Sequence, residues 1–400
     1  MTKEVKNVPE LRFSGFSEEW KKKKLEEIAY INDGTHMTPN YVQAGIPFFS
    51  VENVTRNDFV NSKFVTEEAY EKYKKRIDIE YNDILMTRIG SIGKVKLVNW
   101  IHSTTFYVSL ALLKIHEGFV PQYISYLLES FKVQKSIMSN SLVTAVPQKI
   151  NLIDLKKVDI VLTISINEQQ RIGDFFSKLD RQIELEEQKL AKLEEQKKGY
   201  MQKIFSQELR FKDDNGKDYP AWEIKKLGDL YKYQQGQQIP VENQYKIQIN
   251  NMKRFIRIVD VTENPKKRYI KDRKESGLIN QKDLIMIRYG ASAGTISMGY
   301  EGVIANNLFK FVKKQNVDNR YFYFLLKKSH FKIKSLSSQS AMPALNFNAM
   351  DTLKFSIPQY SEQQKIGGFF SELDKLVEKQ NQKIDGLKER KKGFLQKMFV

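Results

Sequence analysis

The sequence predicts an internally duplicated α/β (α+β) protein in which two globular segments alternate with two long helices. Residues 168–206 and 362–400 align without gaps, and 21 of their 39 positions are identical. A longer segment that mixes strand-like runs with amphipathic helices precedes each copy. The repeat distance of about 200 residues is too long for a solenoid, so it indicates two tandem halves of one design.

Composition sets the limits on chemistry and location. The chain has 400 residues, 41% hydrophobic, with 66 Lys+Arg against 48 Asp+Glu. The net charge of +18 points towards a polyanion such as nucleic acid. Cysteine is absent and the four histidines lack metal-ligand spacing, so we expect no metal site. Neither a signal segment nor a run of the about 18 apolar residues that span a bilayer is present, which predicts a cytoplasmic protein with no membrane partner.

Four segments follow one another along the chain. We predict a globular segment over 1–160, a helical one over 161–206, a second globular segment over 207–358 and a second helical one over 359–400. Strands are expected at GIPFFSV, DILMTRI, KVKLV and FYVSLALLKI in the first globular segment, and at RFIRIVDV, DLIMIRY, TISMGY and LFKFVKK in the second. Tyr123–Met138 and Arg320–Lys334 have helical spacing.

Both helical segments carry a heptad pattern. The apolar a and d positions are Leu179, Ile183, Leu190 and Leu193 in the first copy, and Leu373, Val377, Ile384 and Leu387 in the second. Polar residues interrupt the pattern at the same two places in each copy. Each run is short for a free-standing coiled coil, so the simplest arrangement is that the two helices pack against each other; the alternative is that each docks on its own globular segment.

The best candidates for direct contact with nucleic acid are two glycine-rich loops that follow strand-like runs. The first contains Arg88, Gly90, Ser91 and Gly93, and the second contains Arg288, Gly290, Ser292 and Gly294. Glycine allows close backbone approach to a phosphate, and arginine can donate two hydrogen bonds to a phosphate or to guanine. A hairpin turn with a surface arginine is the alternative interpretation.

Polar loops and basic runs add further candidates. Thr35 and His36 lie in one polar loop, and Gln237 lies in its counterpart in the second half. Base-edge or phosphate contacts suit such side chains, although most polar loops bind nothing. Basic runs that suit a phosphate track include Lys74, Lys75 and Arg76, then Lys267 and Arg268, and also Arg273-Lys274; a solvated surface is the alternative.

Named catalytic motifs are missing. The chain has no Asp/Asn-Pro-Pro-aromatic loop of an amino-methyltransferase, no phosphate-binding Gly-x-x-x-x-Gly-Lys loop and no Gly-x-Gly-x-x-Gly after a strand. No Pro-Asp pair is present to begin a nuclease site. We therefore predict no catalytic residues, with function carried by binding.

The repeated motif E-Q-Q-(R/K)-I-G-x-F-F-S-x-L-D resembles the specificity subunits of type I restriction–modification enzymes. It occurs at Glu168–Asp180 and at Glu362–Asp374, each followed by a Lys-Lys-Gly tail, and the resemblance covers nearly the whole chain. One departure is visible, because the proline that usually precedes the repeat is present as Pro358 but is Ile164 in the first copy.

The resemblance implies a non-catalytic, sequence-specific DNA-binding subunit. The two globular segments would be target-recognition domains, each reading one half of a bipartite site in double-stranded DNA. The helices would pair antiparallel, set the spacing between the half-sites and bind two methyltransferase subunits, and restriction subunits would join that core. S-adenosylmethionine, ATP and Mg²⁺ would then be cofactors of the partners, with none bound by this chain. A stand-alone DNA-binding or architectural protein and a self-contained modification enzyme remain as alternatives.

Overall fold

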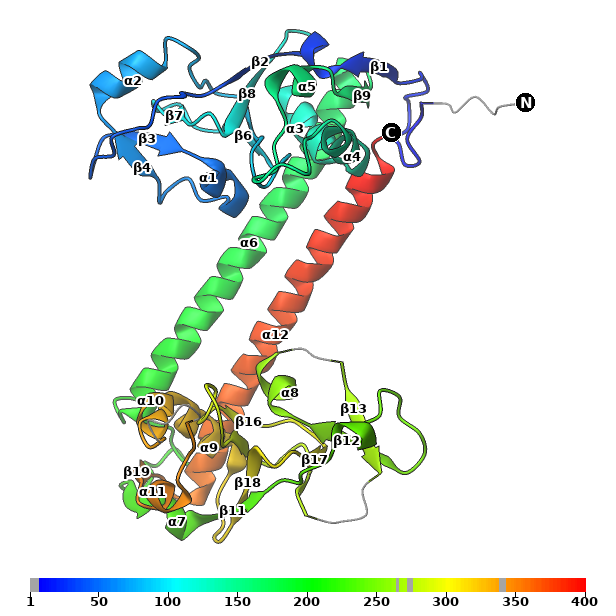
Figure 1. The fold of residues 1–400 in the computed structure, drawn as a ribbon. Helices are drawn as coiled ribbons and strands as arrows, with labels where there is room; N and C mark the ends of the chain where they lie inside the picture. Colours follow the sequence, from blue (N-terminus) through cyan, green and yellow to red (C-terminus); the bar gives the residue numbers. More distant parts are fainter. Residues whose placement is uncertain (1–6, 264–265, 272–275, 338–342) are drawn as a thin grey trace. The chain divides into compact units, whose positions relative to one another are not determined.

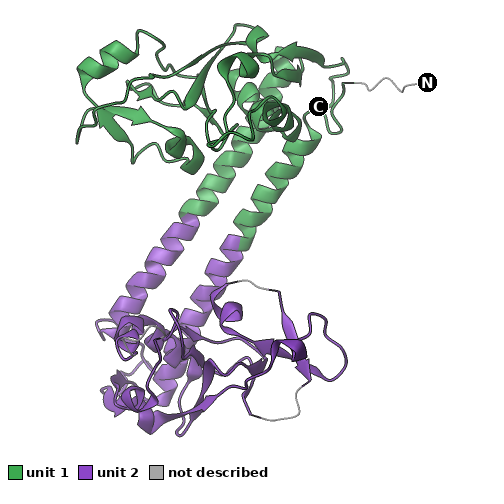
Figure 2. Ribbon diagram, viewed as in Figure 1, with its two compact units in different colours: residues 1–188, 382–400 green, residues 189–381 purple. Residues whose placement is uncertain are grey.

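The computed structural model describes residues 7–263, 266–271, 276–337 and 343–400. The chain forms two compact units, one of residues 1–188 with 382–400 and one of residues 189–381 (Figures 1 and 2). Each unit contains one globular segment and about half of each long helix, α6 (Ile166–Phe205) and α12 (Tyr360–Lys397). Although these helices are long, none of the helices in the described ranges is apolar enough to cross a membrane.

The described residues of the first unit form three small sheets. Its main sheet is antiparallel in the order β2-β8-β5-β6, from Ala29–Asp33, Leu110–Ile115, Ile84–Thr87 and Val95–Leu97. A second sheet has the order β4-β3-β7, from Lys63–Val65, Ile46–Phe49 and Thr105–Phe106. The strands β1 (Lys21–Lys24) and β9 (Asp159–Leu162) pair antiparallel. The helices are η1 (Leu25–Glu27), α1 (Val51–Arg56), α2 (Glu67–Tyr73), α3 (Pro121–Glu129), α4 (Phe131–Ser139) and α5 (Leu152–Lys156).

The second unit repeats this plan. Its sheets have the orders β11-β18-β15-β16, from Tyr231–Gln235, Leu308–Lys313, Ile285–Ile287 and Ile296–Ser297, and β13-β12-β17-β14, from Arg268–Lys271, Met252–Ile256, Gly302–Ile304 and Leu278–Ile279. The strands β10 (Glu223–Lys226) and β19 (Lys354–Ile357) pair antiparallel. The helices are α7 (Leu227–Leu230), η2 (Val241–Asn243), α8 (Ile258–Thr262), α9 (Asn319–Lys328), α10 (His330–Lys334) and α11 (Phe347–Asp351). The predicted duplicated α/β fold with two long helices is confirmed.

Local predictions differ from the structure at three kinds of place. The run RFIRIVDV is strand only up to Ile256, because α8 begins at Ile258 and Asp260 in its first turn accepts a hydrogen bond from the Arg257 backbone at 3.0 Å. The two predicted helices are each broken, at Ser130 and Ser329. Ser130 adopts extended backbone angles and is fully buried, so the chain turns there. The run FYVSLALLKI is likewise split into β7 and β8.

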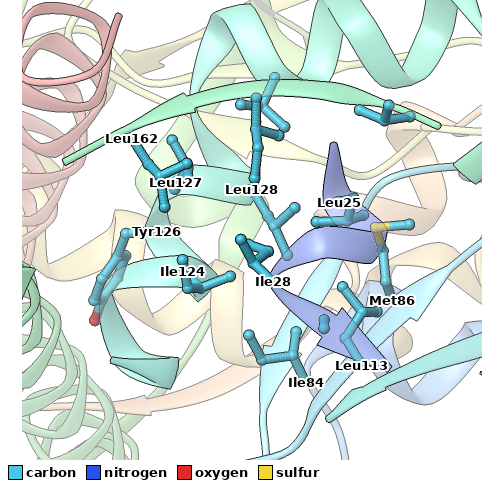
Figure 3. Close-up of a cluster of buried hydrophobic side chains, with 14 of the residues drawn as sticks. Leu25, Ile28, Ile84, Met86, Leu113, Ile124, Tyr126, Leu127, Leu128 and Leu162 are labelled. Carbon is cyan, nitrogen blue, oxygen red and sulfur yellow. The ribbon is translucent and has the colours of Figure 1, made fainter. Parts of the chain in front are cut away.

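Apolar side chains from sheet and helices fill a core in each unit. In the first unit, Ile84, Met86 and Leu113 of the main sheet pack against Ile124 and Leu128 of α3 (Figure 3). The residues that follow α12 complete this core, since Met398 and Phe399 belong to the same buried cluster. The second unit has an equivalent core that includes Ile204 from the end of α6. Each core therefore draws on both long helices.

The Glu-Gln-Gln motif fastens each long helix to its globular segment. Glu168, which is fully buried, accepts hydrogen bonds from Arg12 at 2.6 and 2.9 Å, and Glu362 accepts them from Arg210 at 3.2 and 2.8 Å. The following glutamine, Gln169, accepts from the backbone at the start of α3, and its counterpart makes the same contact to α9. A side chain at Gly367 would collide with the backbone of α9, so glycine permits this close packing. These contacts between helix and globular segment account for the repeat of the Glu-Gln-Gln motif in both halves.

Candidate nucleic-acid interface

The first glycine-rich loop connects β5 to β6 in the first unit. Gly90 and Gly93 have φ of +78° and +82°, which glycine adopts without strain. The Gly90 amide donates to the Gln148 carbonyl at 2.7 Å, and the Ile150 amide donates to the Arg88 carbonyl at 2.9 Å. Gly90 and Ser91 are exposed at the tip of the loop. The backbone is thus fixed while the tip faces solvent.

Arg88 is buried beneath this loop, so we revise its interpretation as a base contact. Its guanidinium donates to Asp33 Oδ2 at 2.7 Å, to the Val108 carbonyl at 2.9 Å and to the Ile150 carbonyl at 3.1 Å. Only 8% of the residue is exposed. Each of its three nitrogens already donates to a protein acceptor, so the geometry favours a structural ion pair that holds the loop against β2.

Several of the predicted DNA-binding residues contact the carboxylate of Asp33. Arg76 binds its Oδ1, and His36 Nε2 lies 3.1 Å from its Oδ2. Burial by itself would raise the pKa of Asp33, but hydrogen bonds from Arg76 and His36 and the charges of Arg76 and Arg88 outweigh it and lower the pKa below its ordinary value. Thr35 is buried, and its hydroxyl accepts from the backbone amide of the second residue after it. Of this loop, His36 is the predicted side chain that faces solvent.

The second glycine-rich loop holds its arginine differently. Gly290 and Gly294 have φ of +88° and +87°, and the loop backbone again donates to a neighbouring segment, here to the Pro343 carbonyl at 2.9 Å. Arg288 is only half-buried, and its guanidinium lies 4.2 Å from the ring centre of Phe347. One of its terminal nitrogens donates to Gln235.

The difference between the two arginines follows from one substitution. Gln235, at the end of β11, takes the place that Asp33 has at the end of β2, so the first loop contains an ion pair and the second a neutral acceptor. Within the described residues, the buried Nε of Arg288 has no hydrogen-bond partner. An arginine that lies over an aromatic ring and uses one terminal nitrogen on a protein acceptor has a second terminal nitrogen suited to bind a phosphate or a guanine edge.

The predicted basic runs lie outside the glycine-rich loops. Lys75 is exposed just after α2, whereas Lys74 pairs with Glu71 at 2.5 Å. In the second unit, Lys267 is exposed and Arg268 begins β13. The predicted run Arg273-Lys274 lies outside the described residues.

A basic groove opens beside β12, β13 and β17. It has a volume of about 970 Å³, and its cationic lining residues are Lys253, Arg254, Lys267 and Lys310. Asp283 and Glu301 also line it, so the groove is mixed in charge with a cationic excess. Gln237, in contrast, is used internally, because its amide donates to the Ser276 carbonyl. Ser292 is half-buried near the second loop.

Sequence reasoning missed the segments that cover the two loops. Residues 142–149 are largely exposed, and Lys149 forms a bridge to Ile89. Ala344 forms the equivalent bridge to Tyr289 in the second unit. The available signal was the pair of Pro-containing stretches TAVPQKIN and SAMPALNF, which occupy the same place in each half.

The heptad positions of the two long helices face each other. In the first unit, Leu179, Ile183 and Leu387 form a buried cluster, and Ile384 is buried as well. Leu190, Leu193, Leu373 and Val377 are half-buried in the second unit. At one polar interruption of the first copy, Glu186 binds Lys383 of the other helix at 2.8 Å.

The Leu-Asp and Lys-Lys-Gly motifs of opposite copies bind each other. Lys391 Nζ lies 2.8 Å from Asp180 in the first unit, and Lys197 binds Asp374 in the second. Burial would lower the pKa of Lys391, but the carboxylates of Glu129 and Asp180 outweigh it and raise that pKa. Because early residues of one helix meet late residues of the other, the pair is antiparallel.

Comparisons with known proteins agree with this architecture. The family described as "Type I restriction modification DNA specificity domain" matches residues 17–195 and 220–389. The putative type I restriction enzyme MjaX specificity subunit of Methanocaldococcus jannaschii is 25% identical, with 94% of this chain and 92% of the relative covered. The MjaIX specificity subunit of the same organism is 24% identical over 95% and 92%.

Solved structures share the fold over nearly the whole chain. The crystal structure of the S subunit of a type I restriction–modification system from M. genitalium covers 98% of this chain and 99% of its own, with a TM-score of 0.66 at 17% identity. A chain from a structural study of complex assembly in a type I system covers 94% and 96%, with a TM-score of 0.54 at 14% identity. The two matched specificity domains span most of the sequence, and the chain therefore belongs to the family of type I restriction–modification specificity subunits.

Proposed function

We propose that this chain selects the DNA target of a type I restriction–modification complex, each unit reading one half of a bipartite site in double-stranded DNA. The duplication carries the proposal. Two specificity-domain matches correspond to two units of similar topology, each with a glycine-rich loop at the same place. Two equivalent readers joined by constant helices suit a target with two separate half-sites.

We propose that the two units contact DNA through different residues. In the second unit, Arg288 and the groove that contains Lys267 are the candidates for base and phosphate contact. In the first unit, the exposed loop tip at Ser91, His36 and Lys75 are the candidates. The charge distribution supports this assignment, because residues 207–361 hold 27 basic and 15 acidic side chains.

The chain itself would be non-catalytic, and its helices would organise the complex. Within the described residues, no group of three or more His, Asp or Glu side chains has the arrangement of a metal site. We propose that the exposed faces of α6 and α12 dock two methyltransferase subunits and that restriction subunits join them. S-adenosylmethionine, ATP and Mg²⁺ would then be cofactors bound by those partner subunits.

Methylome sequencing tests the proposal. Adenine methylation is mapped in host cells with the gene, without it, and with a copy restored. We expect one bipartite motif to be methylated only when the gene is present. Unchanged methylation in the deletion strain would refute the proposal.

Purification separates the alternatives. The tagged chain should co-purify with a methyltransferase, whereas purification alone with full DNA binding would favour an architectural protein. Methyl transfer by the isolated chain would establish a self-contained enzyme.

A further inference from the structure

Each unit exposes a phenylalanine at the same structural position. Phe131 is 65% exposed and Phe331 is 85% exposed. Each lies in the first turn of the helix after the break, Phe131 as the first residue of α4 and Phe331 as the second of α10, and two residues before a buried core residue, Val133 or Ile333. Single exposed apolar side chains are ordinary on protein surfaces, so the feature to explain is that the same ring is exposed at the same place in both halves.

The helices that carry these rings are fastened to the glycine-rich loops. Gln134, three residues after Phe131, donates to the Gly93 carbonyl at 2.7 Å. In the second unit, His330, next to Phe331, lies 3.3 Å from the Gly294 carbonyl. Each exposed ring is therefore held by an element that contacts the loop proposed to face the DNA.

The charge around the rings fits DNA. α4 carries Lys132 and Lys135, and α10 carries Lys332 and Lys334, with no acidic residue in either helix. Lysines that bind phosphates around one apolar wedge are typical of proteins that enter the minor groove.

Retention of the same residue in both halves also fits DNA. The two units read different bases, so residues that recognise base edges are expected to differ between them. A base step offers a π-face whatever its sequence, so an aromatic contact tolerates different targets. A phenylalanine is thus the kind of contact that two divergent readers can share.

We propose that Phe131 and Phe331 pack against a base step in the respective half-sites and partly unstack it. The proposal rests on the proposed function, since it assigns a second contact to the same DNA-reading units. It predicts DNA distortion at two places, one for each unit.

The test uses the complete complex with its methyltransferase and a duplex that contains the methylated motif. Phe131→Ala and Phe331→Ala are compared with Ile153→Ala and Ile224→Ala, which remove apolar side chains of similar exposure, 66% and 74%, elsewhere in each unit. Assembly is measured by native mass spectrometry and affinity by titration. Unstacking is followed through 2-aminopurine fluorescence, with the probe placed in one half-site at a time.

We expect each phenylalanine variant to assemble normally and to bind the target about tenfold more weakly. Phe131→Ala should abolish the fluorescence rise in one half-site and Phe331→Ala in the other, while the isoleucine variants behave as wild type. Wild-type affinity and fluorescence in both phenylalanine variants would overturn the inference. So would weakened assembly in variants that bind DNA normally once assembled, because the rings would then contact a protein. If the wild-type complex itself fails to prefer the motif over a scrambled duplex, the proposed function fails instead.

Discussion

Arg88 and Arg288 both follow a strand and begin a glycine-rich loop, but we expect their replacement by alanine to affect different properties. Arg88→Ala should lower the stability of the fold, and Arg288→Ala should weaken DNA binding. Arg88→Ala leaves the Asp33 carboxylate, 2% exposed, without one of its cationic partners and removes donors to two carbonyls. Breaking a buried ion pair costs about 3–5 kcal/mol, and the remaining contacts from Arg76 and His36 place the loss near the lower end. For a unit of this size, about 3 kcal/mol corresponds to a fall in Tm of about 6–12 °C.

Arg288→Ala removes no buried charge pair. Its stacking on Phe347 contributes about 0.5–1 kcal/mol, so stability should change little. Loss of a two-donor base contact should instead cost about 1–3 kcal/mol of binding and relax sequence preference in one half-site.

Thermal denaturation and titration with target and single-mismatch duplexes measure both effects in the assembled complex. Arg288→Lys is the control, because it keeps the charge but cannot donate in a fork. If Arg88→Ala left Tm unchanged while altering sequence preference, our assignment of the two arginines would be refuted.

Four further outcomes are expected. Exchanging residues 207–358 for another such segment should change one half of the methylated motif, and a change in both halves on methylome sequencing would contradict separate readers. Inserting seven residues at matched places in both helices adds about 10 Å and keeps the heptad phase, so the preferred half-sites should lie about three base pairs further apart; unchanged spacing would show that the helices do not set it. Lys391→Asp should destabilise the first unit by about 1–3 kcal/mol in chemical denaturation, and adding Asp180→Lys should restore part of that loss, since Glu129 still faces the site. Because the folded-state pKa of Asp33 is lowered, its contribution to stability should be present above its ordinary pKa of 3.8 and be lost as pH falls through the folded-state value; Asp33→Asn should flatten this part of the stability–pH curve.

Much of the architecture could be predicted from the sequence because repeats and hydrophobic periodicities indicate it directly. The duplication, the heptad positions and most strands depend on local patterns, so Leu179 and Ile183 could be placed on a buried face before any coordinates. The Glu-Gln-Gln and Leu-Asp motifs were visible as repeats, but their partners were not. Arg12 and Lys391 lie far from Glu168 and Asp180 in sequence, and no local signal pairs them.

The placement of the candidate site residues was decided by tertiary structure. By itself the sequence determined that two equivalent loops follow equivalent strands, each with an arginine before its glycines. It did not determine that Arg88 turns inward, because that depends on Asp33 arriving from β2 across the sheet. In the second half Gln235 arrives instead, and Arg288 stacks on Phe347 from a helix far along the chain. A buried carboxylate draws an arginine into the protein because the unpaired charge is costly, whereas beside a neutral amide the arginine stays half-buried over an aromatic ring.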